Sequence, residues 1–258
     1  MPDLAIPLIA EIRASTKIIS LFDAFATAVK VGQHFAVKFG GQVSLLEAEN
    51  LRHVSANSKV PVPKVLATMT EPETACNFIV LEYIDSQGLK EIWKFLTLAE
   101  KLNVSKEIQN APDNLRKLQS LGYFGALNRH RFPDRVFWTP EENPETSGPF
   151  ETEGELNEEI IRRLKAFEPT SHISLLRTLI LNTLKGHHTV FTHGDLHPKN
   201  ILMSRYPEYW GICNDTIAGR FRPDWLKLAQ RIMPIYTTKY LVLQAIRSLL
   251  FYWMWLDI

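Results

Sequence analysis

The segment that most constrains this chain is residues 191–200, which read FTHGDLHPKN. An apolar, strand-like run at 189–191 leads into it, and a second apolar run at 201–203 follows it. Between the two runs stand Asp195 and, five residues later, Asn200, with a proline that disfavours helix shortly before the asparagine. The pattern therefore predicts a polar loop between two strands, with one carboxylate and one amide at a fixed spacing.

An aspartate and an asparagine at this spacing are suited to one phosphoryl-transfer event. The Asp195 carboxylate would accept the proton of an attacking hydroxyl or orient that hydroxyl, and the Asn200 carbonyl oxygen would help to hold a magnesium ion. The pattern H-x-D-x-x-x-x-N is the catalytic-loop signature of kinase-like enzymes. We expect His193 to brace this loop through hydrogen bonds rather than to act as the base.

With a glycine between the histidine and the aspartate, the segment resembles the catalytic loop of the aminoglycoside phosphotransferase family of small-molecule kinases. Residues 28–222 follow the pattern of fungal-type members, including VPVPKVL at 60–66 and GPFETE at 148–153. The resemblance implies an α+β, protein-kinase-like two-lobe fold, with a small β-rich N-terminal lobe containing one helix and a larger, mainly helical C-terminal lobe. It also implies magnesium-dependent transfer of phosphate from ATP to a hydroxyl of a small molecule, such as an aminoglycoside or a secondary metabolite.

The order of predicted elements agrees with two lobes. The N-terminal part reads as strands at 28–31, 34–39 and 77–84, an extended segment at 60–66 and a helix at 44–57. A polar, turn-like stretch at 85–88 marks the boundary, so we expect lobes at residues 1–84 and 85–258. The C-terminal part is mainly helical, with helices expected at 89–96, 97–119, 153–166 and 173–185.

A kinase-like small lobe needs a cation on a strand, paired to a carboxylate on the following helix. Lys38 lies in a predicted strand and Glu47 nine residues later in the predicted helix, so Lys38 would contact the nucleotide phosphates and Glu47 would orient it. The alternative is a solvent-facing lysine and a glutamate that only forms a capping box with Ser44. Glu82 and Ile84 match the family's hinge, whose backbone would bind adenine, or they simply end a strand.

The second magnesium ligand of the family pattern is altered. A gapless alignment that matches residues 211–212 and 218–220 places Asn214, a neutral ligand, where the family has an aspartate. Asp215 is adjacent, but a one-residue shift on an extended segment turns a side chain to the opposite face unless a bulge intervenes. Three interpretations stay open: a kinase that uses Asp215, a slow kinase that uses Asn214, or a kinase-like binding or accessory protein without phosphotransfer, its cleft used for other chemistry.

The composition limits which kinds of protein and which partners this chain can be expected to have. The 258 residues are 45% hydrophobic and 22% charged, the balance of a globular chain with room for two lobes. A net charge of +1 provides no strong field toward nucleic acid or an anionic membrane, and we expect neither partner. Cys76 and Cys213 have no zinc-site spacing and favour a reduced, cytoplasmic protein. No basic segment precedes the short N-terminal apolar stretch, which argues against a signal peptide.

Two further stretches leave alternatives open. The apolar segment 240–256 is short for a membrane span and is interrupted by Gln244 and Arg247, so a buried terminal helix is favoured over a membrane segment. Its aromatic residues could instead mediate self-association. The acidic stretch 141–159 could form a pocket for a cationic acceptor, or it could be a solvated, charged loop.

Overall fold

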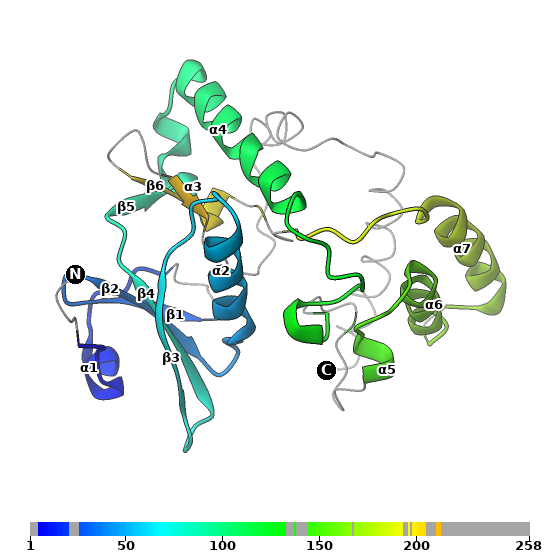
Figure 1. Cartoon of the computed structure of the whole chain (residues 1–258), viewed down its shortest axis with the longest axis horizontal. Coiled ribbons are helices and arrows are strands. Elements are labelled where there is room, and N and C mark those ends of the chain that lie inside the picture. Colours follow the sequence, from blue (N-terminus) through cyan, green and yellow to red (C-terminus); the bar gives the residue numbers. More distant parts are fainter. Residues whose placement is uncertain are drawn as a thin grey trace. The chain divides into compact units, whose positions relative to one another are not determined.

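The three-dimensional structure is a computed structural model. It describes residues 5–20, 26–132, 137, 144–166, 168–192, 196, 198–204 and 210–212. Two compact units are present (Figure 1). The first unit comprises Met1–Leu118 and Thr192–Ile232, and the second comprises Gln119–Phe191 and Met233–Ile258.

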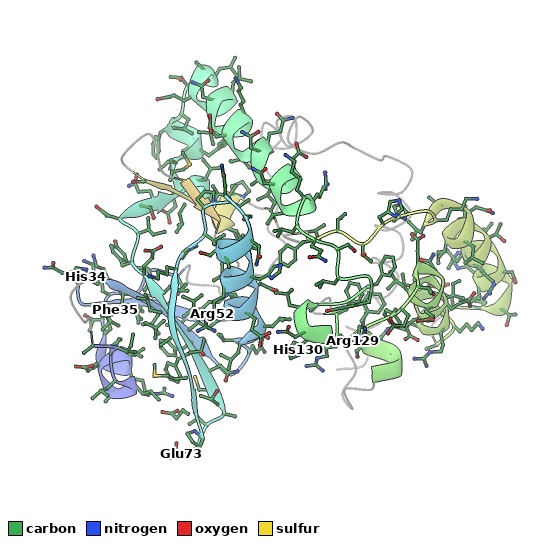
Figure 2. All side chains as sticks on the ribbon, viewed as in Figure 1. His34, Phe35, Arg52, Glu73, Arg129 and His130 are labelled. Atoms are coloured by element: carbon green, nitrogen blue, oxygen red, sulfur yellow. The ribbon has the colours of Figure 1, made fainter. Side chains whose placement is uncertain are left out.

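The first unit is built on a four-stranded antiparallel sheet. Its strands lie in the order β1-β2-β4-β3, with β1 at Thr27–Val31, β2 at Phe35–Gly40, β3 at Val65–Glu71 and β4 at Cys76–Glu82. Gly32 turns the chain between β1 and β2 at φ 58°, a conformation that glycine adopts without steric cost. Figure 2 shows His34 and Phe35 at one end of this sheet and Glu73 at the tip of the β3–β4 hairpin. The strands predicted at 28–31, 34–39 and 77–84 are therefore present.

Side chains alternate between the two faces of a strand, so each face of this sheet has its own composition. One face carries an apolar cluster that includes Val37, Phe78 and Val80, all fully buried, together with Ile12 from the short helix α1 (Ile9–Ala14). Buried side chains of this size stabilise a fold by roughly 1.5–3 kcal/mol each. The opposite face packs through Ile79 against α2 (Leu46–Asn57) (Figure 1). The sheet is thus covered by a different helix on each face.

The start of α2 corrects one prediction. The helix begins at Leu46, and its N-cap is Leu45, whose side chain makes no capping hydrogen bond. The Ser44 hydroxyl accepts a hydrogen bond from the Leu46 amide at 3.3 Å, and the Glu47 carboxylate accepts one from the Lys38 ammonium at 2.7 Å. The predicted Ser44–Glu47 capping box is wrong, because the N-cap is Leu45 and the Glu47 carboxylate bonds to the Lys38 ammonium of the sheet.

A second, three-stranded antiparallel sheet completes the first unit. Its strands lie in the order β5-β6-β7, with β5 at Ser86–Gly88, β6 at Ile201–Ser204 and β7 at Trp210–Ile212. Beside it lie α3 (Leu89–Ile92), η1 (Trp93–Phe95), α4 (Leu98–Arg116) and η4 (Pro198–Asn200). Leu89, Trp93, Ile108 and Ile201 form their shared core. The stretch 85–88, predicted to be a turn, contributes β5. The sequence pattern did not indicate this strand, because its pairing partner β6 lies far along the chain.

The second unit is helical. It contains η2 (Leu127–Arg129), α5 (Pro144–Ser147), α6 (Glu153–Leu164) and α7 (Thr170–Thr183), which agrees with the helices predicted near 153–166 and 173–185. Its core includes Phe150, Ile161 and Ile180. The segment 189–191 was predicted as a strand, but within the described residues no strand pairs with it, and the Thr189 hydroxyl instead hydrogen-bonds to the Ser120 hydroxyl. In the described part of the chain, no helix has the length and apolar character needed to cross a membrane.

Hydrogen bonds between His187 and Glu153 fix the beginning of α6. The His187 ring contacts one oxygen of the Glu153 carboxylate, and the His187 amide donates to the other at 3.2 Å. Burial alone would raise the pKa of the Glu153 carboxyl, but the hydrogen bonds from His187 outweigh it and hold that pKa below its ordinary value of 4.5. A negative charge at this position also interacts favourably with the positive end of the helix dipole.

Replacement of Gly125 with alanine is expected to destabilise the protein. A Cβ at this position would lie 2.8 Å from the Pro149 Cβ and 3.2 Å from the His130 carbonyl oxygen, so backbone must move. We expect a loss of about 1–3 kcal/mol in the free energy of unfolding, measured with urea. The control is Gly154→Ala in α6, where the nearest atom is 3.7 Å away and stability should be unchanged or slightly increased. Equal stability of the two variants would contradict the packing argument.

The Glu153–His187 pair predicts a pH dependence. Because the folded-state pKa of Glu153 is lowered, its contribution is complete above the unfolded value of 4.5 and disappears as pH falls through the lower folded value. Wild type should exceed Glu153→Gln in unfolding free energy by up to about 1 kcal/mol at pH 6, and the difference should vanish in acid. Glu73→Gln, at the exposed hairpin tip, controls for the change in net charge. A difference that is constant with pH would refute the proposed cause.

Candidate active site

An ion pair joins the sheet to α2. Lys38 lies in β2 opposite Ala28 of β1 and Ile79 of β4, on the sheet face that packs against α2. Its Nζ is 2.7 Å from the Glu47 Oε2, and the two side chains are only 15% and 12% exposed. Partial burial strengthens a charge pair because fewer water molecules screen it. The structure thus brings together the two residues that the sequence singled out as cation and carboxylate.

Small side chains lie beside this pair. Ala28 is directly opposite Lys38, and Ala36, two residues before Lys38, is directly opposite Lys30 of β1. All four share one face, because cross-strand neighbours and residues two apart point the same way. On β1 and β2, the side chains between the two lysines are therefore the methyl groups of Ala28 and Ala36, a surface on which a planar group could lie.

The predicted hinge, from Glu82 at the end of β4 to Ile84, is tied to its surroundings by backbone and side-chain hydrogen bonds. The Glu82 amide donates to the Lys64 carbonyl at 3.0 Å, and the Glu82 carboxylate accepts from the Lys64 amide at 2.9 Å. The Tyr83 amide donates to the His34 carbonyl at 2.8 Å, and the Ser86 hydroxyl donates to the Ile84 carbonyl at 3.1 Å. The hinge candidate is therefore attached to the β1–β2 turn on one side and to β5 on the other.

Strand pairing connects this segment to the polar loop. In the register of β5 and β6, Ser86 pairs with Ser204 and Gly88 pairs with Leu202. Asn200 ends η4 immediately before β6, and its side chain is fully buried. Leu196, from the loop itself, packs against the core of the β5–β6 region. One end of the polar loop is thus anchored directly beyond the hinge candidate.

Four predicted site residues lie outside the described residues: His193 and Asp195 of the loop, and the two metal-ligand candidates Asn214 and Asp215. Asn200 is the predicted magnesium ligand that the structure describes, and its amide oxygen is a chemically suitable donor. Within the described ranges, no three histidine, cysteine, aspartate or glutamate side chains gather as a metal site would require. The described residues are compatible with a magnesium ion that Asn200 holds together with ligands from the rest of the chain.

The described carboxylates of the acidic stretch, at residues 151–159, are engaged inside the second unit. Each has a partner there, either a basic side chain or a backbone amide. The pairs are Glu151 with Arg129, Glu153 with His187, Glu155 with the amide of Glu151, Glu158 with Arg177, and Glu159 with Arg162. These contacts favour a structural role for residues 151–159 over that of an open, negatively charged pocket.

Sequence reasoning missed one residue of this face. Lys30 lies beside the hinge candidate, with its Nζ 3.5 Å from the centre of the Tyr83 ring. The sequence could have indicated Lys30, since a tight turn after Val31 places Lys30 and Lys38 on the same face of a hairpin. The partner ring could not be identified in this way, because Tyr83 follows β4 and lies far from the hairpin in the sequence.

A profile of the phosphotransferase enzyme family (APH) matches residues 42–212, a span that runs from just before α2 to the end of β7. The chain belongs to this family. The match includes Glu47, the hinge candidate and the whole loop from 191 to 200. No curated protein sequence matches the chain.

Solved structures identify the fold. Aminoglycoside phosphotransferase APH(4)-Ia matches with a TM-score of 0.50 at 15% identity, over 79% of this chain and 67% of that one. A thermostable mutant of that enzyme, in a ternary complex with ADP and hygromycin B, matches with a TM-score of 0.50 at 13% identity, over 76% and 65%. The chain thus spans about two thirds of these structures. At such identities the likeness establishes fold alone, and the predicted kinase-like α+β fold is confirmed.

The Lys38–Glu47 pair should contribute to stability more than a surface pair does. In a double-mutant cycle with Lys38→Met and Glu47→Gln, we expect a coupling free energy above about 1 kcal/mol, from urea unfolding. The matched control is the cycle of Arg177→Met and Glu158→Gln, whose side chains are 42% and 51% exposed and whose coupling should stay below about 1 kcal/mol. If the two cycles gave the same coupling, burial would not strengthen the Lys38–Glu47 bond.

Proposed function

We propose that this protein is a magnesium-dependent phosphotransferase that transfers the terminal phosphate of ATP to a hydroxyl group of a small molecule. The observation that carries the proposal is the partly buried pair of Lys38 and Glu47, which lies in the same unit as Asn200. Phosphoryl transfer in kinase-like folds requires such a cation–carboxylate pair together with metal ligands on a catalytic loop.

Each residue has a separate role in this proposal. Lys38 binds the phosphates of the nucleotide, and Glu47 holds the lysine in position. Asp195 orients the acceptor hydroxyl and accepts its proton, while His193 braces the loop. Asn200, with a further ligand near residue 214, would hold the magnesium ion, which neutralises charge on the phosphates when bound.

The nucleotide and the acceptor are supported to different degrees. The relative solved with ADP and hygromycin B shares this fold, which supports a nucleotide in the same region. Glu82 and Ile84 supply the backbone groups that would bind the adenine base. The carboxylates at 151–159 have partners within their own unit, so they do not favour a polycationic acceptor. We therefore propose a small-molecule alcohol whose recognition does not depend on that acidic stretch.

A second candidate function rests on Asn214. If this neutral residue stands where the family has a magnesium-binding aspartate, the metal loses part of its charge compensation. The protein would then bind nucleotide without transferring phosphate efficiently, and it would act as a binding or accessory protein. Asp215, one residue later, is the alternative ligand that would preserve catalysis.

Binding and turnover measured together test the proposal. Wild type should bind ATP in the presence of magnesium and release ADP. The rate of ADP release should rise when the acceptor is added. Lys38→Met should weaken ATP binding at least about tenfold, because it removes the phosphate contact. Asp195→Ala should keep ATP binding and lose turnover. Lys106→Met, at an exposed lysine in α4, is the control and should behave as wild type. Absence of ATP binding at millimolar magnesium would rule out the phosphotransferase.

Two further variants distinguish the metal ligands. If Asp215 is the ligand, Asp215→Ala abolishes turnover and Asn214→Ala does not. If Asn214 occupies the metal position, Asn214→Asp raises turnover strongly over wild type. A wild type that binds ATP without turnover, together with a gain in Asn214→Asp, would establish the second candidate function instead.

A further inference from the structure

Lys30 and Tyr83 form a cation–π pair on the same sheet face as Lys38. The Lys30 Nζ lies 3.5 Å from the centre of the Tyr83 ring, and both residues are partly buried. A lysine ammonium is attracted to the electron-rich face of an aromatic ring at this distance. The pair joins β1 to the end of β4, two strands that are not neighbours in the sheet.

The backbone of Tyr83 is held by a hydrogen bond to the β1–β2 turn. Its amide donates to the carbonyl of His34, in the turn that links β1 to β2 (Figure 2). It also stands between Glu82 and Ile84, the residues proposed to bind adenine through their backbones. The Lys30–Tyr83 pair therefore lies at the hinge end of the proposed nucleotide site.

The two lysines of this face lie at opposite ends of the small-residue surface. The register pairs Ala28 with Lys38 and Lys30 with Ala36, so the lysines are offset by two residues, about 7 Å along the strands. Lys38 is near α2 and forms an ion pair with Glu47, whereas Lys30 is near the hinge and forms the cation–π contact with Tyr83. A nucleotide with its phosphates at Lys38 would place its nucleoside part toward Lys30.

We propose that Lys30 and Tyr83 form the wall that holds the nucleoside part of the nucleotide. The ammonium stays on the Tyr83 ring, and the aliphatic stem of Lys30 packs against the base and ribose, since long lysine stems readily cover apolar surfaces. Lys30 is then a nucleoside-binding residue and does not contact the phosphates. This inference rests on the proposed function, because it assumes that a nucleotide occupies this face.

The test compares ligands with and without phosphate. Dissociation constants of adenosine, ADP and ATP, with magnesium present, are measured by competition against a fluorescent ATP analogue. Lys30→Ala and Tyr83→Leu should each weaken all three ligands by the same factor, about fivefold. The double variant should lose little more than either single variant, since the two side chains act as a unit. Tyr83→Phe keeps the ring and should retain wild-type affinity.

Lys38→Met provides the contrasting pattern, because it should weaken ADP and ATP while adenosine binding stays unchanged. Lys106→Ala, at an exposed lysine in α4, is the lysine control, and thermal unfolding of each variant checks that the fold is kept. Should Lys30→Ala fail to fold, Tyr83→Leu against Tyr83→Phe decides the same question.

Three outcomes separate the hypotheses. If wild type binds none of the ligands, the proposed function fails. If wild type binds them and neither Lys30→Ala nor Tyr83→Leu changes the affinity for adenosine, this inference is wrong while the proposed function stands. If Lys30→Ala weakens ADP and ATP but not adenosine, Lys30 is a phosphate ligand, and the assignment to the nucleoside is overturned.

Discussion

The alternation of side chains along the β1–β4 sheet is the constraint on which the rest of the first unit depends. Because successive residues of a strand point to opposite faces, the apolar positions around Phe78 all meet α1, and the positions around Ile79 meet α2. The same alternation places Lys38 on the α2 face, within reach of Glu47. A one-residue slip of β2 would bury the lysine in the α1 cluster, where its charge would have no partner.

The ion pair and the strand pairing do different work at the candidate site. The bond between Lys38 and Glu47 fixes the orientation of the lysine side chain relative to α2. The β5–β6 pairing fixes the end of the polar loop at Asn200, since this residue directly precedes β6. The placement of Asn200, the predicted metal ligand, therefore depends on the backbone hydrogen bonds of the β5–β6 pair.

Sequence patterns predicted what is local and missed what depends on distant partners. The strands and α2 follow from period and turn residues, and the nine-residue spacing of Lys38 and Glu47 follows from a strand leading into a helix. Residues 86–88 look like a turn by composition, and only β6 makes them a strand. The Ser44 cap looked favourable locally, but the ammonium of Lys38 competed for Glu47. No local sequence pattern could predict the cation–π contact between Lys30 and the ring of Tyr83.

The connectivity of the two sheets has a consequence for the order in which the protein assembles. Strands β1 to β4 and α2 form one continuous stretch of chain, so their hairpins can close early during synthesis. The β5–β6 pair must wait until residue 204 has been made, and it closes a very long loop at an entropic cost. The β1–β4 sheet is thus expected to be complete before the β5–β6–β7 sheet can begin to form, because β6 and β7 are made much later.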